Sequence, residues 1–414
     1  MSLARTLIAF LLLAASPTWA GDFDLGGGDD EPKALRFSGL LSARYGHTSQ
    51  KRSWLLGGPN KLRFGGADRD NNTSGDRDAH VFSVPQASLM LDADVPMNAK
   101  VHVQLNMDAD SDSGNGGLGV VEAYASAEGR RDDWGGRLRA GAFIPAVSWE
   151  HPGPAWSTRW TITPSAVGTW IGEEVRTMGV EAALQRTMGD HSARLTAAAF
   201  SGNDQAGALI YYRGWAMHDY QADINQSYPV TVAGAVVTER PFQELDGRLG
   251  FYGRADAGLF GEALKLTGGY WTNEGDIGAR QTVLGSRLGG WSTQFWDYGA
   301  MSQVGRLTLV GHFMKGQSAC WACDRVPWLA WYGLASYSVG SWTVSGRYDR
   351  YEVERRRWED GYALTGCVQR ALSPRQRLAA EYIYALSRPG ASARPSMQKD
   401  QLVQLDWRLL WGER

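Results

Sequence analysis

Apolar and polar side chains alternate between residues 87 and 107, on both sides of a turn at Pro96-Met97-Asn98. Successive side chains of a β-strand point to opposite faces of the sheet, and proline and asparagine favour turns. The segment is therefore predicted to form a hairpin with one apolar face. The polar residues of its other face are Asp92, Asp94, Lys100, His102, Gln104, Asn106 and Asp108.

The same alternation recurs along the rest of the chain. It is clear in segments 35–45, 137–144, 249–257, 264–270, 342–349 and 377–386. Short turns are expected at 129–135, 188–191, 260–262, 303–305, 338–341 and 372–376, with longer polar stretches between the hairpins. The pattern predicts about sixteen strands. The long segment 204–245 can hold one more hairpin, which would raise the number to about eighteen.

The alternation is typical of a membrane barrel. A soluble β-sandwich also alternates, but here the apolar face is often alanine or glycine, and aromatic residues lie towards strand ends, as in an interfacial girdle. The mean hydropathy is −0.33, and no apolar run approaches the roughly 20 residues of a membrane helix. The last strand alternates from Val403 to Trp411, followed by Gly412-Glu413-Arg414. We predict an all-β fold, a transmembrane antiparallel up-and-down barrel whose first and last strands pair.

The N-terminal residues predict export. Residues 1–20 combine Arg5, a short apolar stretch and small residues at Thr18 and Ala20, which indicates a cleaved signal peptide. We expect residues 21–33 to form a flexible segment and residues 34–414 a single barrel domain. The formal net charge of −2 gives no indication of a nucleic-acid partner, and three cysteines are too few for a disulfide scaffold.

The loop after the fifth predicted strand, residues 145–174, is long and rich in tryptophan, proline and glycine. If the first loop is external, this is the third external loop. An exposed loop has little reason to carry four tryptophans, so we expect it to fold back into the lumen. The residues expected to line a constriction there are Glu150, His151, Trp156, Arg159 and Trp160.

Two runs around this loop carry a family resemblance. GAFIPAVSW and WTITPSAVGTWIGEEVRTMGVEAAL, within residues 141–184, resemble the phosphate-selective porin O and P family. The resemblance implies a sixteen-stranded, usually trimeric diffusion channel whose third loop narrows the pore. It also implies a preference for anions, set by lumen arginines and lysines, although no motif here aligns those positions one by one.

Strand phasing places charges of both signs on the inner face. The basic residues expected there are Arg36, Arg44, Arg137, Arg139, Arg194, Arg248, Arg254, Lys265, Arg347, Arg377 and Arg408. The acidic ones are Asp92, Asp94, Asp108, Glu122, Glu181, Asp256, Asp349, Glu381 and Asp406. Rings of charge set pore selectivity. A mixed lumen can prefer anions, separate the signs onto opposite walls, or hold solvated charges that pair with each other.

Three other features suggest chemistry without establishing it. Cys320 and Cys323 form a CxxC, which can be a redox centre or half a metal site, but a local disulfide that stiffens a loop is the expectation, with Cys367 unpaired and facing the lumen. Acidic residues at 68–76 and 108–112 would suit calcium, but their spacing fails the EF-hand pattern, so we predict no metal and no cofactor.

The sequence thus predicts a porin of the bacterial outer membrane for passive diffusion of small hydrophilic solutes, with an expected preference for anions. Its expected partners are outer-membrane lipid, those solutes and two further copies in a homotrimer. We expect no enzyme activity, because His151 has no evident nucleophile partner. A barrel enzyme of phospholipase or protease type and a structural or adhesion barrel are the alternatives.

Overall fold

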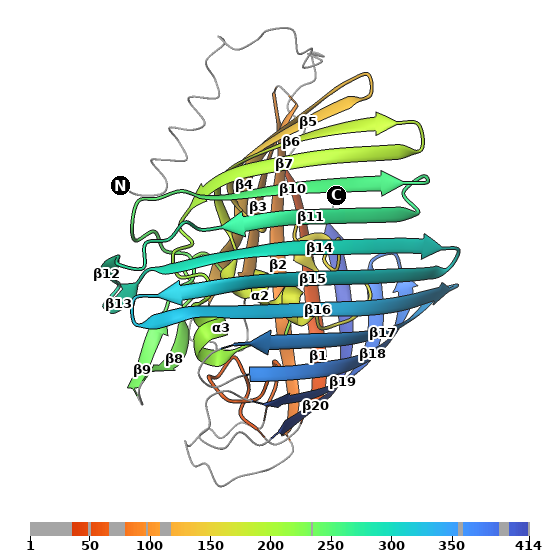
Figure 1. Cartoon of the computed structure of the whole chain (residues 1–414). Coiled ribbons are helices and arrows are strands. Elements are labelled where there is room, and N and C mark those ends of the chain that lie inside the picture. The colour runs from red at the N-terminus through yellow and green to blue at the C-terminus, as the bar shows by residue number, and fades with distance from the viewer. Residues whose placement is uncertain are drawn as a thin grey trace, which may run out of the picture.

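The computed structural model describes residues 35–48, 51–65, 79–96, 98–107, 117–232, 235–354, 359–388 and 397–412. Sixteen strands of this part form a closed antiparallel barrel (Figure 1), which confirms the predicted fold class. In order around the wall they are β1 (Arg36–Thr48), β2 (Ala79–Val95), β3 (Ala99–Met107), β4 (Leu118–Arg131), β5 (Trp134–Phe143), β6 (Thr177–Met188), β7 (His191–Ser201), β10 (Gly250–Leu259), β11 (Leu264–Thr272), β14 (Trp291–Val304), β15 (Leu307–Cys320), β16 (Cys323–Val339), β17 (Trp342–Val353), β18 (Glu359–Ser373), β19 (Gln376–Arg388) and β20 (Gln398–Gly412).

The barrel closes where β1 pairs with β20. Their register runs without a break from Ser38 opposite Gly412 to Thr48 opposite Leu402. Glycine at position 39 leaves room for the indole ring of Trp411 across this seam, because a Cβ there would overlap the ring. Closure gives each wall strand two paired edges, so no backbone edge is left open to lipid.

The long segment 204–245 adds no strands to the wall. It contains the short helix α3 (Ala208–Arg213) and a separate hairpin of β8 (Tyr228–Val232) and β9 (Ala235–Glu239). A second hairpin, β12 (Arg280–Val283) with β13 (Ser286–Gly289), also lies outside the barrel sheet. The number of wall strands in the described part of the chain is therefore sixteen, and the predicted alternative of eighteen is wrong.

Two further helical segments lie between β5 and β6, the 3-10 turn η3 (Pro154–Trp156) and helix α2 (Ala166–Glu174). Figure 1 shows α2 inside the ring of strands and α3 at one end of the barrel, near β8. No helix among the described residues is long and apolar enough to cross a membrane.

The two faces of the wall follow the predicted alternation. Exposed apolar side chains point outwards, such as Leu138 on β5 and Leu378 on β19. Aromatic residues lie near the strand ends on this face, as Trp134 and Trp342 do at the starts of β5 and β17. A closed barrel with such a surface spans a lipid bilayer, as barrels of the bacterial outer membrane do.

Strand connections are short at one end of the barrel and mostly long at the other, which marks the periplasmic and the external end. Three external loops matter for the lumen: L1 (residues 49–78), L3 (144–176) and L4 (202–249). Residues 1–34, which include the predicted signal peptide and flexible segment, lie outside the described residues, as do the acidic stretches 68–76 and 108–112.

Candidate functional site

Loop L3 leaves the wall after β5 and enters the lumen, as predicted. It reaches strands far from its origin, since the side-chain amide of Gln86 on β2 donates to the carbonyl of Ala155, and α2 contacts β16 and β17. On the β17–β20 side, the wall supplies carboxylates and guanidinium groups to the loop backbone. L3 is thus held at several points around the wall.

Carboxylates on the wall accept hydrogen bonds from backbone N–H groups of L3. Glu381 on β19 accepts from the amides of Ile162 at 2.6 Å and Thr163 at 3.0 Å. Asp349 on β17 accepts from the amide of Ala166, the first residue of α2. A carboxylate at a helix N-terminus also interacts favourably with the helix dipole. These bonds satisfy buried donors that would otherwise destabilise the loop.

Arg347 on β17 is the main cation of this contact. It donates to the carbonyl oxygens of Thr163 at 2.8 Å and Pro164 at 2.9 Å, and its Nη1 lies 3.3 Å from Oε1 of Glu150 in L3. Glu150 also accepts from the backbone and the hydroxyl of Ser165, the N-cap of α2. Burial raises the pKa of Glu150, although Arg347 and Ser165 oppose that shift.

Loops L1 and L4 fill further space at the external end. Asp219 in L4 pairs with Arg44 on β1 at 2.7 Å and with Arg63 in L1 at 3.1 Å. Burial disfavours the charged carboxylate, but the two arginines together hold the pKa of Asp219 below its usual value. Lys61 in L1 pairs with Glu359 at the start of β18, at 2.8 Å. Both clusters tie a loop to the wall.

Helix α2 joins the three loops. Its Glu173 accepts from the indole of Trp54 in L1 at 2.7 Å and lies 2.6 Å from Nε2 of His218 in L4. The next residue, Glu174, accepts from the indole of Trp170 at 2.6 Å and from the amide of Leu209 at 2.9 Å. Burial raises the pKa of Glu174 to about 8. L1, L3 and L4 therefore pack as one unit at the external end of the barrel.

The five residues predicted for the constriction differ in their exposure to solvent. Glu150 and Trp160 are buried, and Glu150 contacts Arg347 of the wall. His151 and Trp156 stack face to face with ring centroids 3.5 Å apart, and burial together with nearby arginines lowers the pKa of His151 to about 3. Arg159 is exposed, with its guanidinium 5.8 Å from the centroid of the Trp160 ring.

Basic side chains gather on neighbouring strands of the wall. Arg137 and Arg139 on β5 both pair with Glu181 on β6, Arg194 on β7 lies opposite Asp256, and Arg254 on β10 pairs with Asp297 at 2.8 Å. The buried Nε–H groups of Arg137, Arg139 and Arg194 have no hydrogen-bond acceptor among the described residues. These three N–H groups are shielded from solvent.

The adjoining strands β2 to β4 carry further inward acids. Asp94 pairs with Arg36 on β1, Asp92 pairs with His102 on β3 at 2.7 Å, and Glu122 accepts from the amide of Ile144 at 2.7 Å. The lumen is thus mixed in charge and strongly paired.

Four predicted lumen residues have other positions or roles. Arg248 is not on the inner face, because it precedes β10 and pairs with Asp276 in an exposed loop contact; alternation alone does not mark where a strand begins. Lys265 pairs with Glu262 near the periplasmic turn. Arg377 and Arg408 both donate to the carbonyl of Thr158 and so hold L3.

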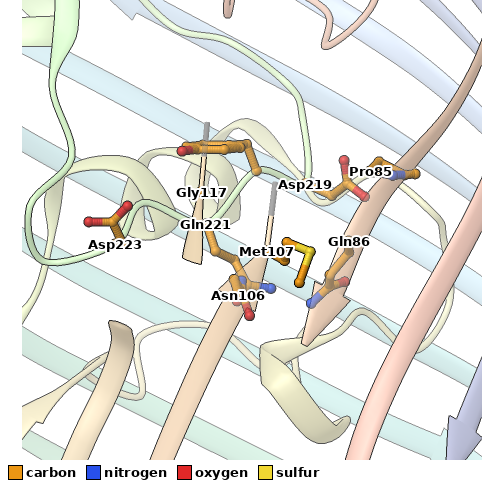
Figure 2. Close-up of a pocket in the computed structure, with 9 residues that line it drawn as sticks. Pro85, Gln86, Asn106, Met107, Gly117, Asp219, Gln221 and Asp223 are labelled. Carbon is orange, nitrogen blue, oxygen red and sulfur yellow. The ribbon is translucent and has the colours of Figure 1, made fainter. Parts of the chain in front are cut away.

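A small pocket lies between the external ends of β2 and β3 and loop L4 (Figure 2). Gln221 in its centre accepts from the amides of Gln104 and Asn106 and donates to the carbonyl of Ala155. Figure 2 shows Asp219 and Asp223 on opposite sides of this glutamine. Sequence reasoning missed L4 at this point, because its polar residues resemble those of a solvated loop.

Two other predicted features can be placed. Cys320 and Cys323 are disulfide-bonded across the tight turn from β15 to β16, and Cys367 is a free, buried cysteine whose inward register partner is Glu381.

The carboxylates of Asp204, Glu244 and Asp246 lie within 4.8 Å of one another. Each accepts backbone N–H bonds, which is sufficient to explain the cluster as a loop-ordering contact.

Comparisons with known proteins support the fold. Neither a protein-family model nor a curated protein sequence matches the chain, so the predicted membership of the O and P porin family stays a prediction. The structure is similar to an anion-selective porin from Comamonas acidovorans, with a TM-score of 0.54 at 13% identity, covering 92% of this chain and 100% of that one.

Two further outer-membrane barrels are similar at comparable levels. The outer membrane channel DcaP of Acinetobacter baumannii has a TM-score of 0.53 at 10% identity, covering 91% of this chain and 97% of that one. The trimer form of OmpT from Vibrio cholerae has a TM-score of 0.52 at 12% identity, covering 92% and 100%. At these identities the likeness establishes the porin-like barrel fold.

Proposed function

We propose that the protein is an outer-membrane channel for passive diffusion of small hydrophilic solutes, with a preference for anions. The observation that carries the preference is the charge of L3. L3 contains three glutamates and two arginines. Glu150, Glu173, Glu174 and Arg176 are buried, whereas Arg159 is exposed. The charge that L3 presents to solvent is therefore positive.

The wall supports the same preference. The arginines of β5, β7 and β10 lie close together in the register and place several guanidinium groups on one part of the lumen wall. A guanidinium binds carboxylate and phosphate oxygens through two parallel hydrogen bonds. An anion passing L3 would exchange part of its hydration shell for these donors, while the neighbouring carboxylates keep binding weak enough for release.

A planar-bilayer measurement tests this function. The refolded full-length barrel should give discrete conductance steps, and its reversal potential in a salt gradient should have the sign of anion preference. Arg159→Gln should shift that potential towards zero. Arg306→Gln, at an exposed periplasmic turn, is the matched control and should leave it unchanged. A heat-modifiable, folded barrel without conductance would favour an enzyme or a structural barrel instead.

We also propose a homotrimer. Three equal conductance steps per insertion are the expected record, and the exposed apolar outer face offers surface for contacts between copies. Single steps of one size, together with the mass of one chain in detergent, would contradict this assembly without affecting the channel.

A further inference from the structure

A groove runs across the outer face of the barrel, over β17 to β20 and on to β1 and β2. Two adjacent rows of register partners line it. One row includes Trp342, Arg370, Leu378 and Ala43, and the other includes Ala380 and Phe82. The groove is also lined by residues whose side chains point into the barrel, and each of them lies between two outward-pointing residues in the sequence. The backbone of these residues therefore forms the bottom of the groove.

The groove runs obliquely from the periplasmic end of the barrel towards its external end. Trp342 is the first residue of β17 and Arg370 lies near the periplasmic end of β18, whereas Ala43 lies in the middle of β1 and Phe82 near the external end of β2. Five steps between strands of about 4.8 Å give a length of about 24 Å. With strands tilted by about 40°, this line rises about 15 Å, half of the hydrocarbon core.

The lower end of the groove carries an outward-facing cation. Arg370 lies opposite Trp342 in the register, with its guanidinium 5.2 Å from the centroid of the Trp342 ring. A cation on the lipid-facing side of a barrel costs least near the interface. There it can extend along an aromatic ring to the headgroups. The rest of the groove is apolar and includes the small side chains of Ala43 and Ala380.

We propose that this groove binds one phospholipid of the periplasmic leaflet. The Arg370 guanidinium binds the phosphodiester, and an acyl chain lies along the apolar floor past Leu378 and Ala380. Three observations favour this occupant over a second barrel. The groove spans the thickness of one leaflet along the membrane normal, its charge is positive at the level of the lipid phosphates, and its remaining surface is apolar. The proposal needs only the membrane-spanning barrel and does not depend on the channel function.

A matched pair of arginines makes the test specific. Arg186 on β6 also lies outwards, opposite Trp134 and 5.1 Å from its ring centroid, but it does not line the groove. Native mass spectrometry of the full-length barrel in detergent would count bound 1-palmitoyl-2-oleoyl phosphatidylglycerol. A diacylglycerol with the same chains, which has no phosphate, is the ligand control.

We expect one retained phosphatidylglycerol and no comparable retention of the diacylglycerol. Arg370→Gln should weaken binding about tenfold, as the loss of one charge-assisted contact predicts, and Arg186→Gln should not. Ala380→Phe should block binding with Arg370 intact, and heat-modifiable migration should verify that each variant is folded. Equal binding by wild type and Arg370→Gln would overturn the proposal. So would an Ala380→Phe variant that loses an oligomer but keeps the lipid.

Discussion

The guanidinium of Arg347 on β17 and the carboxylate of Glu150 in L3 form a buried ion pair, with side-chain exposures of 0% and 2%. Arg347 also binds Asp349, at 2.7 Å, and two carbonyl oxygens of the loop. One side chain thus compensates two buried carboxylates and fixes the position of L3 across the lumen.

Replacing this arginine should release the loop. Arg347→Met leaves Glu150 and Asp349 without their cation, so the free energy of unfolding should fall by about 3–5 kcal/mol, measured by urea titration of tryptophan fluorescence. Single-channel conductance should rise if the channel proposal holds. The double variant Arg347→Met/Glu150→Gln removes one uncompensated charge and should recover part of the stability. Wild-type stability in the single variant would contradict the anchoring role.

Glu381 on β19 should contribute through hydrogen bonds to backbone rather than through an ion pair. Glu381→Ala removes the acceptor for the amides of Ile162 and Thr163, and we expect a loss of about 1.5–3 kcal/mol in unfolding free energy. Glu381→Gln keeps one carbonyl acceptor and should lose less. If both variants lose the same amount in the urea titration, the backbone contact is not the cause.

The wall could be predicted from the sequence because alternation in a membrane barrel is enforced at every position. An outward polar residue meets lipid and an inward apolar one meets water or polar loops, so Leu138 and Arg139 fall on the expected faces. Arg248 shows the limit: it continues the alternating pattern but precedes β10, because the periodicity does not locate a strand end.

The interior could not be predicted in the same way. Asp219 meets Arg44 and Arg63, which lie 175 and 156 residues away in the sequence, and no local pattern encodes such a pairing. The burial of Glu150 depends in turn on Arg347, 197 residues away. A polar residue in a loop is ordinarily expected to face solvent. The sequence therefore predicted that Glu150 lines the constriction, whereas it anchors L3 to the wall.

Arg194 should contribute to ion selectivity from the wall. It lies on β7 opposite Asp256, and its Nε–H has no acceptor among the described residues. Arg194→Gln leaves the adjacent carboxylate in place and removes a positive charge, so the reversal potential in a salt gradient should shift towards cation preference. Asp256→Asn should shift it the opposite way. Shifts of the same sign in both variants would rule out a direct electrostatic effect.

The packing of L3 against L4 should weaken as the pH rises. Burial raises the pKa of Glu174 to about 8, so the folded chain keeps this proton where the unfolded chain has lost it. The resulting stability is fully present below the ordinary pKa of about 4.5 and is lost as the pH rises from there through about 8, at about 1.4 kcal/mol per pH unit. Burial also raises the pKa values of Asp204 and Glu239 to about 7, and these groups act in the same direction. Urea titrations at pH 7 and pH 8.5, above the range in which the lowered pKa of His151 acts in the opposite direction, should therefore give a lower unfolding free energy at pH 8.5. Glu174→Gln should reduce that difference without removing it, and an unchanged difference in this variant would show that Glu174 titrates normally.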